Sequence, residues 1–89
     1  MILGVNYLKL KKQLLKHYRN TRVYIETKGE FNTRFWIDKS KIIINRNRIV
    51  IANDDIDCNI LLDYIKKFKS NSICRIELIG KESTYILEL

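Results

Sequence analysis

The stretch Lys41-Ile42-Ile43-Ile44-Asn45-Arg46-Asn47-Arg48-Ile49-Val50-Ile51-Ala52 contains two apolar runs separated by four polar residues. Consecutive apolar positions give a strand two apolar faces, as in strands at the centre of a sheet that is covered on both sides. We therefore expect a hairpin of two central strands, Lys41–Ile44 and Ile49–Ala52. Because so short a chain has few elements to cover two faces, a homodimer through the Ile42–Ala52 hairpin is the alternative.

An alternating pair of segments precedes this hairpin, at Thr21–Lys28 and Phe31–Asp38, joined through Gly29. A three-residue loop of residues 28–30 would place Val23 opposite Phe35 on the core side. On the outer side the same register places Arg22 opposite Trp36 and Tyr24 opposite Arg34. The outer face therefore interleaves cations with aromatic rings.

Residues 53–69 follow the central hairpin and have the pattern of a helix. Asn53-Asp54-Asp55 supplies a cap, and Asp57 adds negative charge to the first turn. The last turn is positive, as the helix dipole favours, with Lys66, Lys67 and Lys69. Apolar residues at helical spacing predict a buried face of Ile56, Ile60, Leu61, Tyr64, Ile65 and Phe68.

The chain ends in a second alternating pair, Ile73–Ile79 and Thr84–Leu89, with a four-residue turn at Gly80–Ser83. This loop length places Arg75 opposite Glu88 on the outer side, an opposite-charge pair that supports the register. On the core side it places Cys74, Ile76 and Leu78 opposite Leu89, Leu87 and Tyr85.

The first helix is expected from about Asn6 to Arg19. At 100° per residue one apolar arc collects Tyr7, Leu8, Leu10, Leu14, Leu15 and Tyr18. The opposite side is a cationic stripe of Lys9, Lys12, Lys16 and Arg19. Residues 1–25 contain no acidic side chain, so nothing local neutralises the stripe.

The predicted order is αββββαββ over a single domain of residues 1–89. This order is typical of a two-layer α+β fold, with an antiparallel sheet of about six strands and two helices on one face. No apolar run is long enough to cross a membrane, and the first residues lack the charged start of a signal peptide. We expect a cytoplasmic protein.

The net charge of +7 is less informative than its position. Ile, Lys and Asn make up 34 of the 89 residues, a skew that AT-rich codons produce without functional selection. Residues 1–52, however, carry 12 Lys and Arg against 3 acidic residues, whereas residues 53–89 carry 5 against 7. The positive half is therefore the candidate binding region.

No catalytic or metal-binding constellation can be found in the sequence, and we expect neither an enzyme nor a cofactor. The single histidine, His17, lacks a clear partner for acid–base work. The acidic cluster at residues 54–57 is better explained as a helix cap than as a metal site. Cys58 and Cys74 are too few for a disulfide framework or a zinc site, and we interpret them as free buried thiols.

Two features in the positive half predict nucleic-acid binding, or binding to a nucleic-acid-handling complex. Phosphates are attracted to the helix stripe, and exposed bases can stack on the aromatic hairpin face. The predicted site comprises Lys9, Lys12, Lys16, Arg19, Arg22, Tyr24, Arg34 and Trp36, extended by Arg46 and Arg48 at the tip of the central hairpin. Both DNA and RNA fit this pattern, and it matches no named module such as an RNP motif or a GXXG loop.

The alternative function is a small protein–protein interaction module or inhibitor, of the kind that phages and mobile elements encode, acting on a larger machine. The surplus of apolar strand surface at residues 42–52 favours it. A basic amphipathic helix also fits a membrane surface, but the sheet is expected to occupy its apolar arc.

Overall fold

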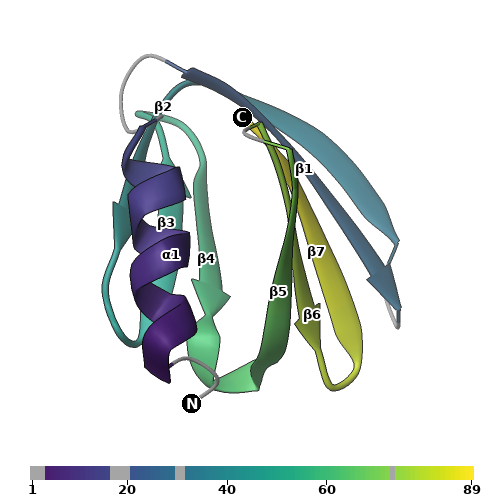
Figure 1. Cartoon of the computed structure of the whole chain (residues 1–89). Coiled ribbons are helices and arrows are strands. Elements are labelled where there is room, and N and C mark those ends of the chain that lie inside the picture. Colours follow the sequence, from purple (N-terminus) through teal and green to yellow (C-terminus); the bar gives the residue numbers. More distant parts are fainter. Residues whose placement is uncertain (1–3, 17–20, 30–31, 73) are drawn as a thin grey trace.

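The computed structural model describes residues 4–16, 21–29, 32–72 and 74–89. Over these residues it is an antiparallel seven-stranded sheet with one α-helix (Figure 1). The α+β class therefore fits, whereas two helices, six strands and the order αββββαββ do not. The elements are α1 (Gly4–Leu15), β1 (Thr21–Gly29), β2 (Thr33–Ile44), β3 (Arg48–Ala52), β4 (Asp57–Leu61), the 3₁₀ turn η1 (Leu62–Tyr64), β5 (Ile65–Ser72), β6 (Arg75–Gly80) and β7 (Ser83–Glu88).

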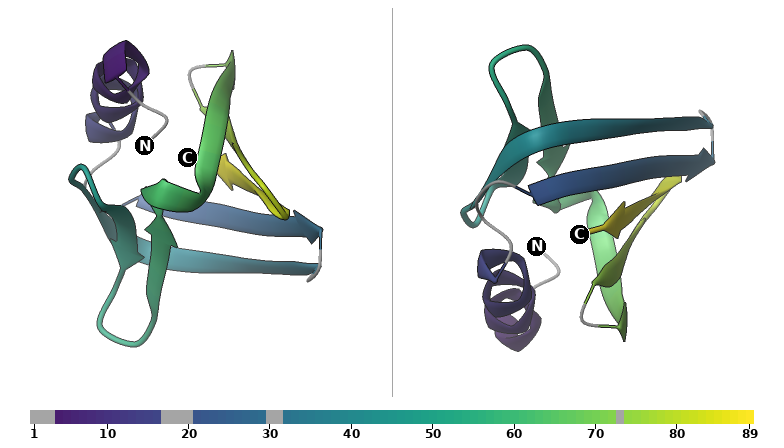
Figure 2. Two further views of the ribbon diagram at one scale, coloured as in Figure 1. Left: turned by 90° about the horizontal axis from the view of Figure 1, so that it is seen from below. Right: turned by 90° about the horizontal axis from the view of Figure 1, so that it is seen from above.

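The strand order is β4-β3-β2-β1-β7-β6-β5. The two edge strands, β4 and β5, are thus neighbours in the chain, joined only by the three residues of η1. So short a connection holds the end of one edge close to the start of the other. The sheet is consequently rolled rather than flat, with an open side between β4 and β5 (Figure 2).

Helix α1 packs against the β2 end of the rolled sheet and lies across the open side from β5 (Figures 1 and 2). Its inward side chains Tyr7, Leu10 and Leu14 are buried. On the β5 side, the Gln13 side-chain amide donates a hydrogen bond of 2.8 Å to the carbonyl oxygen of Ser72. The same carbonyl oxygen accepts a hydrogen bond of 3.2 Å from the Ser70 hydroxyl, so this acceptor at the end of the edge strand is satisfied. Among the described residues no helix has the length and apolarity needed to cross a bilayer.

The core fills the inside of the rolled sheet and is built mostly from isoleucine. β-branched side chains suit the pleated surface of a strand, which explains why so isoleucine-rich a chain adopts this fold. Besides the three helix residues, it contains Val23, Ile25, Ile37, Ile42, Ile44, Ile49, Ile51, Ile60, Leu62, Ile65, Ile76, Leu78 and Leu87.

The predicted second helix is wrong, because residues 57–72 form β4, η1 and β5. The same apolar residues also fit a period of two: Ile60 and Leu62 are buried, and Leu61 between them is exposed. Strand β3 needs a partner for its backbone groups, and β4 pairs with it along its whole length. This long-range pairing decides between two periods that the sequence alone leaves equal.

The capping signal at Asn53 closes a turn and begins no helix. The Asn53 side-chain oxygen accepts hydrogen bonds of 2.8 Å from the backbone N–H groups of both Asp55 and Ile56. An N-cap makes the same bonds, two and three residues ahead. Here the Asn53 N–H also donates to the Ile56 carbonyl oxygen, at 2.9 Å, and the chain turns from β3 into β4.

The predicted strands 31–38 and 41–44 are one bent strand, β2. Lys39 has a φ of +51°, and the ladder with β1 shifts register between Thr21 and Val23. The extra residue leaves Asp38 and Lys39 both exposed, after which Ser40 is buried and the alternation resumes in phase. The bulge thereby turns β2 so that its first part pairs with β1 and its last part with β3.

The predicted register of the final hairpin is confirmed, since Ile76 pairs with Leu87. Across the β2–β3 turn, Ile44 pairs with Ile49. Arg75 and Glu88 also form the expected ion pair. Cys74, however, is exposed rather than in the core, because it lies in the β5–β6 connection.

Two expectations about burial are also wrong. In the single chain, Ile43 on the outer side of β2 is 58% exposed, so the central hairpin is not covered on both faces. Helix α1 ends at Leu15 rather than Arg19, and Leu8 and Leu15 of its predicted apolar arc are exposed. The sheet edge covers a narrower stripe of the helix than a flat sheet would.

The left-handed conformation of Lys39 predicts an unusual order of substitutions. Lys39→Gly should raise the free energy of unfolding by up to about 1 kcal/mol, because glycine adopts positive φ without steric cost. Lys39→Val should lower it by about 1–3 kcal/mol, because a β-branched residue is strained there. Urea unfolding measures both. Lys41→Val, at an extended exposed position of the same strand, is the control, and a Lys39→Val variant as stable as this control would contradict the account.

Candidate nucleic-acid interface

The cationic stripe of α1 faces solvent. Lys9, Lys12 and Lys16 are all exposed, on the side of the helix away from Leu10 and Leu14. Arg19, the fourth member predicted from the sequence, lies outside the described residues, as does His17. The helix therefore presents the three lysines as expected.

Arg22, Tyr24, Arg34 and Trp36 also lie on one face of the β1–β2 hairpin, although the strands pair in a different register from the predicted one. Tyr24 pairs with Trp36, so the ladder is two residues from the predicted one. The last pair before the turn is Thr27 with Thr33, whose hydroxyl oxygens are 2.7 Å apart, so the connection is longer than three residues. A slip of two keeps every side chain on its predicted face.

Arg22, Tyr24 and Trp36 are in direct contact on this face. The Arg22 guanidinium carbon lies 4.3 Å from the centre of the Trp36 ring, and the Tyr24 and Trp36 ring centres are 4.8 Å apart. The arginine reaches the tryptophan diagonally, since Trp36 is directly opposite Tyr24. These contacts stabilise the hairpin whether or not a ligand binds.

Carboxylates that the sequence analysis had not placed on this face balance its charge. The Arg22 Nε lies 2.9 Å from an oxygen of Asp38. Glu26 is directly opposite Arg34 and lies 3.7 Å from the Lys28 amino nitrogen. The face is therefore a mixed, nearly neutral surface, which weakens it as a phosphate site.

Tyr24 is held in place by the carboxylate of Glu26. Its hydroxyl donates to a Glu26 oxygen at 3.1 Å. Partial burial raises the pKa of the Tyr24 hydroxyl above its ordinary value, and the hydrogen bond to Glu26 adds to the rise. The ring is thus kept neutral and oriented along the hairpin.

Arg46 and Arg48 lie apart from this face. They occupy the turn after the far end of β2, beyond the bend at Lys39. The Asn45 side-chain oxygen accepts from the N–H groups of Asn47 and Arg48, at 2.8 and 3.0 Å, and so shapes the turn. Both arginines are exposed, but they extend neither the hairpin face nor the helix stripe.

Three further lysines, which the sequence analysis had assigned to a helix end, lie on the edge strand β5. Lys66, Lys67 and Lys69 are exposed, and Lys69 is opposite Glu77 of β6. Charged side chains on an edge strand prevent pairing with another chain, which is a structural reason for their presence. The signal available in the sequence was Lys67 and Lys69 alternating with the half-buried Phe68, a period of two.

A hydrogen bond joins α1 to the end of β5, so the two sets of lysines lie on elements that meet at the open side. Gln13 contacts Ser72 of β5, and Lys9 and Lys16 lie one helical turn on either side of Gln13. We call Lys9, Lys12, Lys16, Lys66, Lys67 and Lys69 the basic seam. Within the described part of the chain, no carboxylate lies within 4 Å of the amino group of any of the six.

Among the described residues there is no metal-binding cluster, and neither cysteine is in a disulfide. No three His, Cys, Asp or Glu side chains among them are arranged to hold a metal ion. Cys58 and Cys74 are both free, and Cys58 is partly buried. Burial raises the pKa of the Cys58 thiol, with a smaller contribution from Asp57, so this thiol is less reactive at neutral pH than an exposed one.

Comparison with protein-family models, with curated proteins and with solved structures finds no match to this chain.

Proposed function

We propose that the protein is a non-catalytic nucleic-acid-binding protein whose phosphate-binding surface is the basic seam. The observation that carries the proposal is the six exposed lysines on two adjacent elements, without ion-pair partners among the described residues. Phosphates that contact such lysines displace condensed counterions, and the released ions supply the free energy of binding.

Helix α1 contributes lysines to this surface and uses its apolar face elsewhere. Tyr7, Leu10 and Leu14 are at most 9% exposed, so among the apolar side chains of residues 7–15 a lipid bilayer could reach only Leu8 and Leu15. A membrane-surface helix inserts a continuous apolar face. Nucleic acid is therefore the better partner for the seam.

Charge reversal within the seam tests the proposal. Wild-type protein should bind a fluorescein-labelled 20-nucleotide strand or duplex, with log affinity falling linearly against log salt concentration. The variant Lys9→Glu/Lys12→Glu/Lys16→Glu should bind at least about ten-fold more weakly and lose about one unit of salt slope per lysine. Fluorescence anisotropy between about 50 and 200 mM salt measures both quantities.

The matched control is Arg34→Glu/Lys39→Glu/Arg46→Glu, which changes the net charge equally but lies on β2 and the β2–β3 turn. It should lose much less affinity and retain most of the slope. Absence of wild-type binding at about 50 mM salt would overturn the proposal, and so would equal losses in the two variants.

A second candidate function is self-association through the outer face of β2, β3 and β4. Ile43 and Val50 are paired on this face, and Ile43 is 58% exposed. Leu61, at 43%, extends the apolar surface onto β4. Exposed apolar side chains grouped in this way are typical of interaction sites.

Charge favours a second copy as the occupant. Lys41, Ala52 and Asp57 form one row across the three strands. A two-fold axis parallel to β3 would place Lys41 of each copy over Asp57 of the other, around a centre of Ile43 and Val50. The Lys41–Asp57 pairs are thus complementary to themselves, as a symmetric dimer requires, whereas Arg48 of β3 would meet Arg48 of the other copy at the other end of the face.

The masses of charge-swap variants distinguish this dimer from a monomer. At micromolar concentration, light scattering after size-exclusion chromatography should give twice the chain mass of 10.7 kDa. Ile43→Glu and Lys41→Asp should each give the monomer mass, and Lys41→Asp/Asp57→Lys should restore the dimer. A wild-type monomer at 200 µM, or a swap that fails to restore the dimer, would contradict this candidate.

A further inference from the structure

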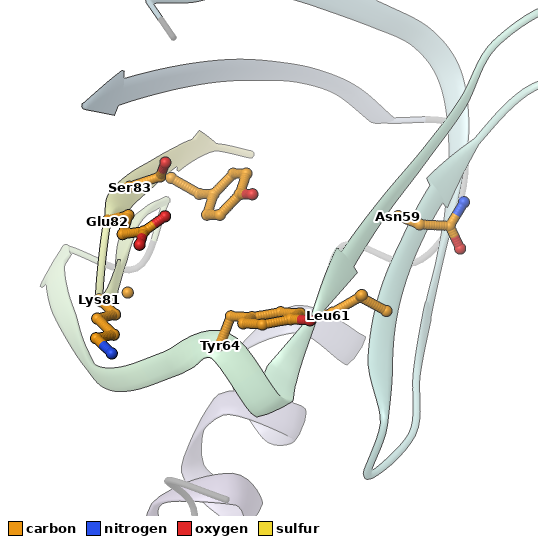
Figure 3. Close-up of a pocket in the computed structure, with 8 residues that line it drawn as sticks. Asn59, Leu61, Tyr64, Lys81, Glu82 and Ser83 are labelled. Atoms are coloured by element: carbon orange, nitrogen blue, oxygen red, sulfur yellow. The ribbon is translucent and has the colours of Figure 1, made fainter. Parts of the chain in front are cut away.

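A pocket of about 460 Å³ opens where η1 meets the β6–β7 turn, at the end of the open side (Figure 3). This volume is within the range of pockets that bind small organic groups. The lining residues are Asn59 and Leu61 of β4, Tyr64 of η1, Gly80, Lys81 and Glu82 of the turn, and Ser83 and Tyr85 of β7.

One wall of the pocket is aromatic and apolar and is unusually open to solvent. Tyr64 is 68% exposed, and Leu61 beside it is 43% exposed. Figure 3 shows the Tyr64 ring lying along η1 next to Leu61, with Glu82 and Ser83 across the opening. A flat ring exposed on one wall, with polar groups opposite, suits a flat ligand that has an apolar face and a polar edge.

The frame of the pocket is held rigidly. The Lys81 N–H donates to the Tyr64 carbonyl oxygen, at 3.3 Å, which ties the β6–β7 turn to η1. At Gly80 a Cβ would lie 2.8 Å from both the Tyr64 and the Ser83 carbonyl oxygens, so no side chain fits there. Tyr64 and the turn therefore keep a fixed spacing before any ligand enters.

The pocket and the β5 part of the basic seam are close in the chain. Lys66 and Lys67 of the seam follow Tyr64 two and three residues along the chain, and Lys81 is part of the pocket wall. If these lysines bind the phosphate of a nucleotide, the base of that nucleotide can reach the Tyr64 ring. The pocket thus has the two elements of a single-strand site, an aromatic platform and cations beside it.

We propose that this pocket receives one unpaired base of a single-stranded nucleic acid. The base stacks on Tyr64 and directs its polar edge to Glu82 and Ser83, which lie across the opening (Figure 3). Glu82 can accept hydrogen bonds from base N–H groups, and the adjacent lysines hold the phosphates. A base inside a duplex has both faces covered by its neighbours, so the pocket selects single strands. The inference rests on the proposed function and adds its substrate class.

Tyr64 variants test this site without disturbing the core, because the side chain is largely exposed. Tyr64→Ala should weaken binding of a labelled 15-nucleotide single strand about ten-fold or more, the loss typical of one stacked base. Tyr64→Phe should bind nearly as wild type, and affinity for a 15-base-pair duplex should be unchanged in both. Ile56→Ala, which removes an exposed apolar side chain of the β3–β4 turn, is the control and should leave single-strand affinity within about two-fold.

A photochemical readout locates the base directly. A single strand that carries 4-thiothymidine should, on irradiation, crosslink to Tyr64 or Tyr85, which peptide mass spectrometry identifies. A crosslink to another region, or equal affinities of Tyr64→Ala and wild type, would overturn the pocket while leaving the seam to be judged by its lysine variants. If neither strand nor duplex binds at about 50 mM salt, both the pocket and the proposed function fail.

Discussion

The closure of the open side by α1 is the interaction on which the rest of the structure depends. The rolled sheet leaves β4 and β5 unpaired with each other, although only η1 separates them in the chain. An open edge of this kind exposes both backbone polar groups and the isoleucine core. Tyr7, Leu10 and Leu14 cover the core there, and Gln13 satisfies a carbonyl group of β5. The helix thus covers the core with one face and presents exposed lysines on the other.

The same closure explains where the free positive charge gathers. The Gln13–Ser72 hydrogen bond joins α1 to the end of β5, so the lysines of both elements lie around the open side. On the β1–β2 hairpin, by contrast, Asp38 and Glu26 balance Arg22, Arg34 and Lys28. The position of the charge relative to carboxylates therefore matters more than the net charge of +7.

The features that could be predicted from the sequence are those set by turn length and by the alternation of side chains along a strand. The β6–β7 register followed from a four-residue turn, and Arg22, Tyr24, Arg34 and Trp36 lie on one face of the β1–β2 hairpin as predicted. The errors arose where a long-range partner decides. The pattern of residues 57–69 fits both a helix and two strands, and the pairing of these strands with β3 and β6 decides for the strands. Lys66, Lys67 and Lys69 were for this reason predicted at a helix end rather than on β5. The pocket at Tyr64 could not be foreseen for the same reason, because it requires η1 to meet a turn that begins 16 residues later at Gly80.

The covering of the core by α1 can be tested by comparing equal truncations on the two faces of the helix. Leu10→Ala and Leu14→Ala remove side chains that are 0% exposed, whereas Leu8→Ala and Leu15→Ala remove leucines of the same helix that are 59% and 44% exposed. Urea unfolding should show each buried truncation lowering the free energy of unfolding by about 2–5 kcal/mol, and each exposed one changing it by about 0.5 kcal/mol or less. Equal effects on the two faces, or no loss at Leu10 and Leu14, would contradict the account.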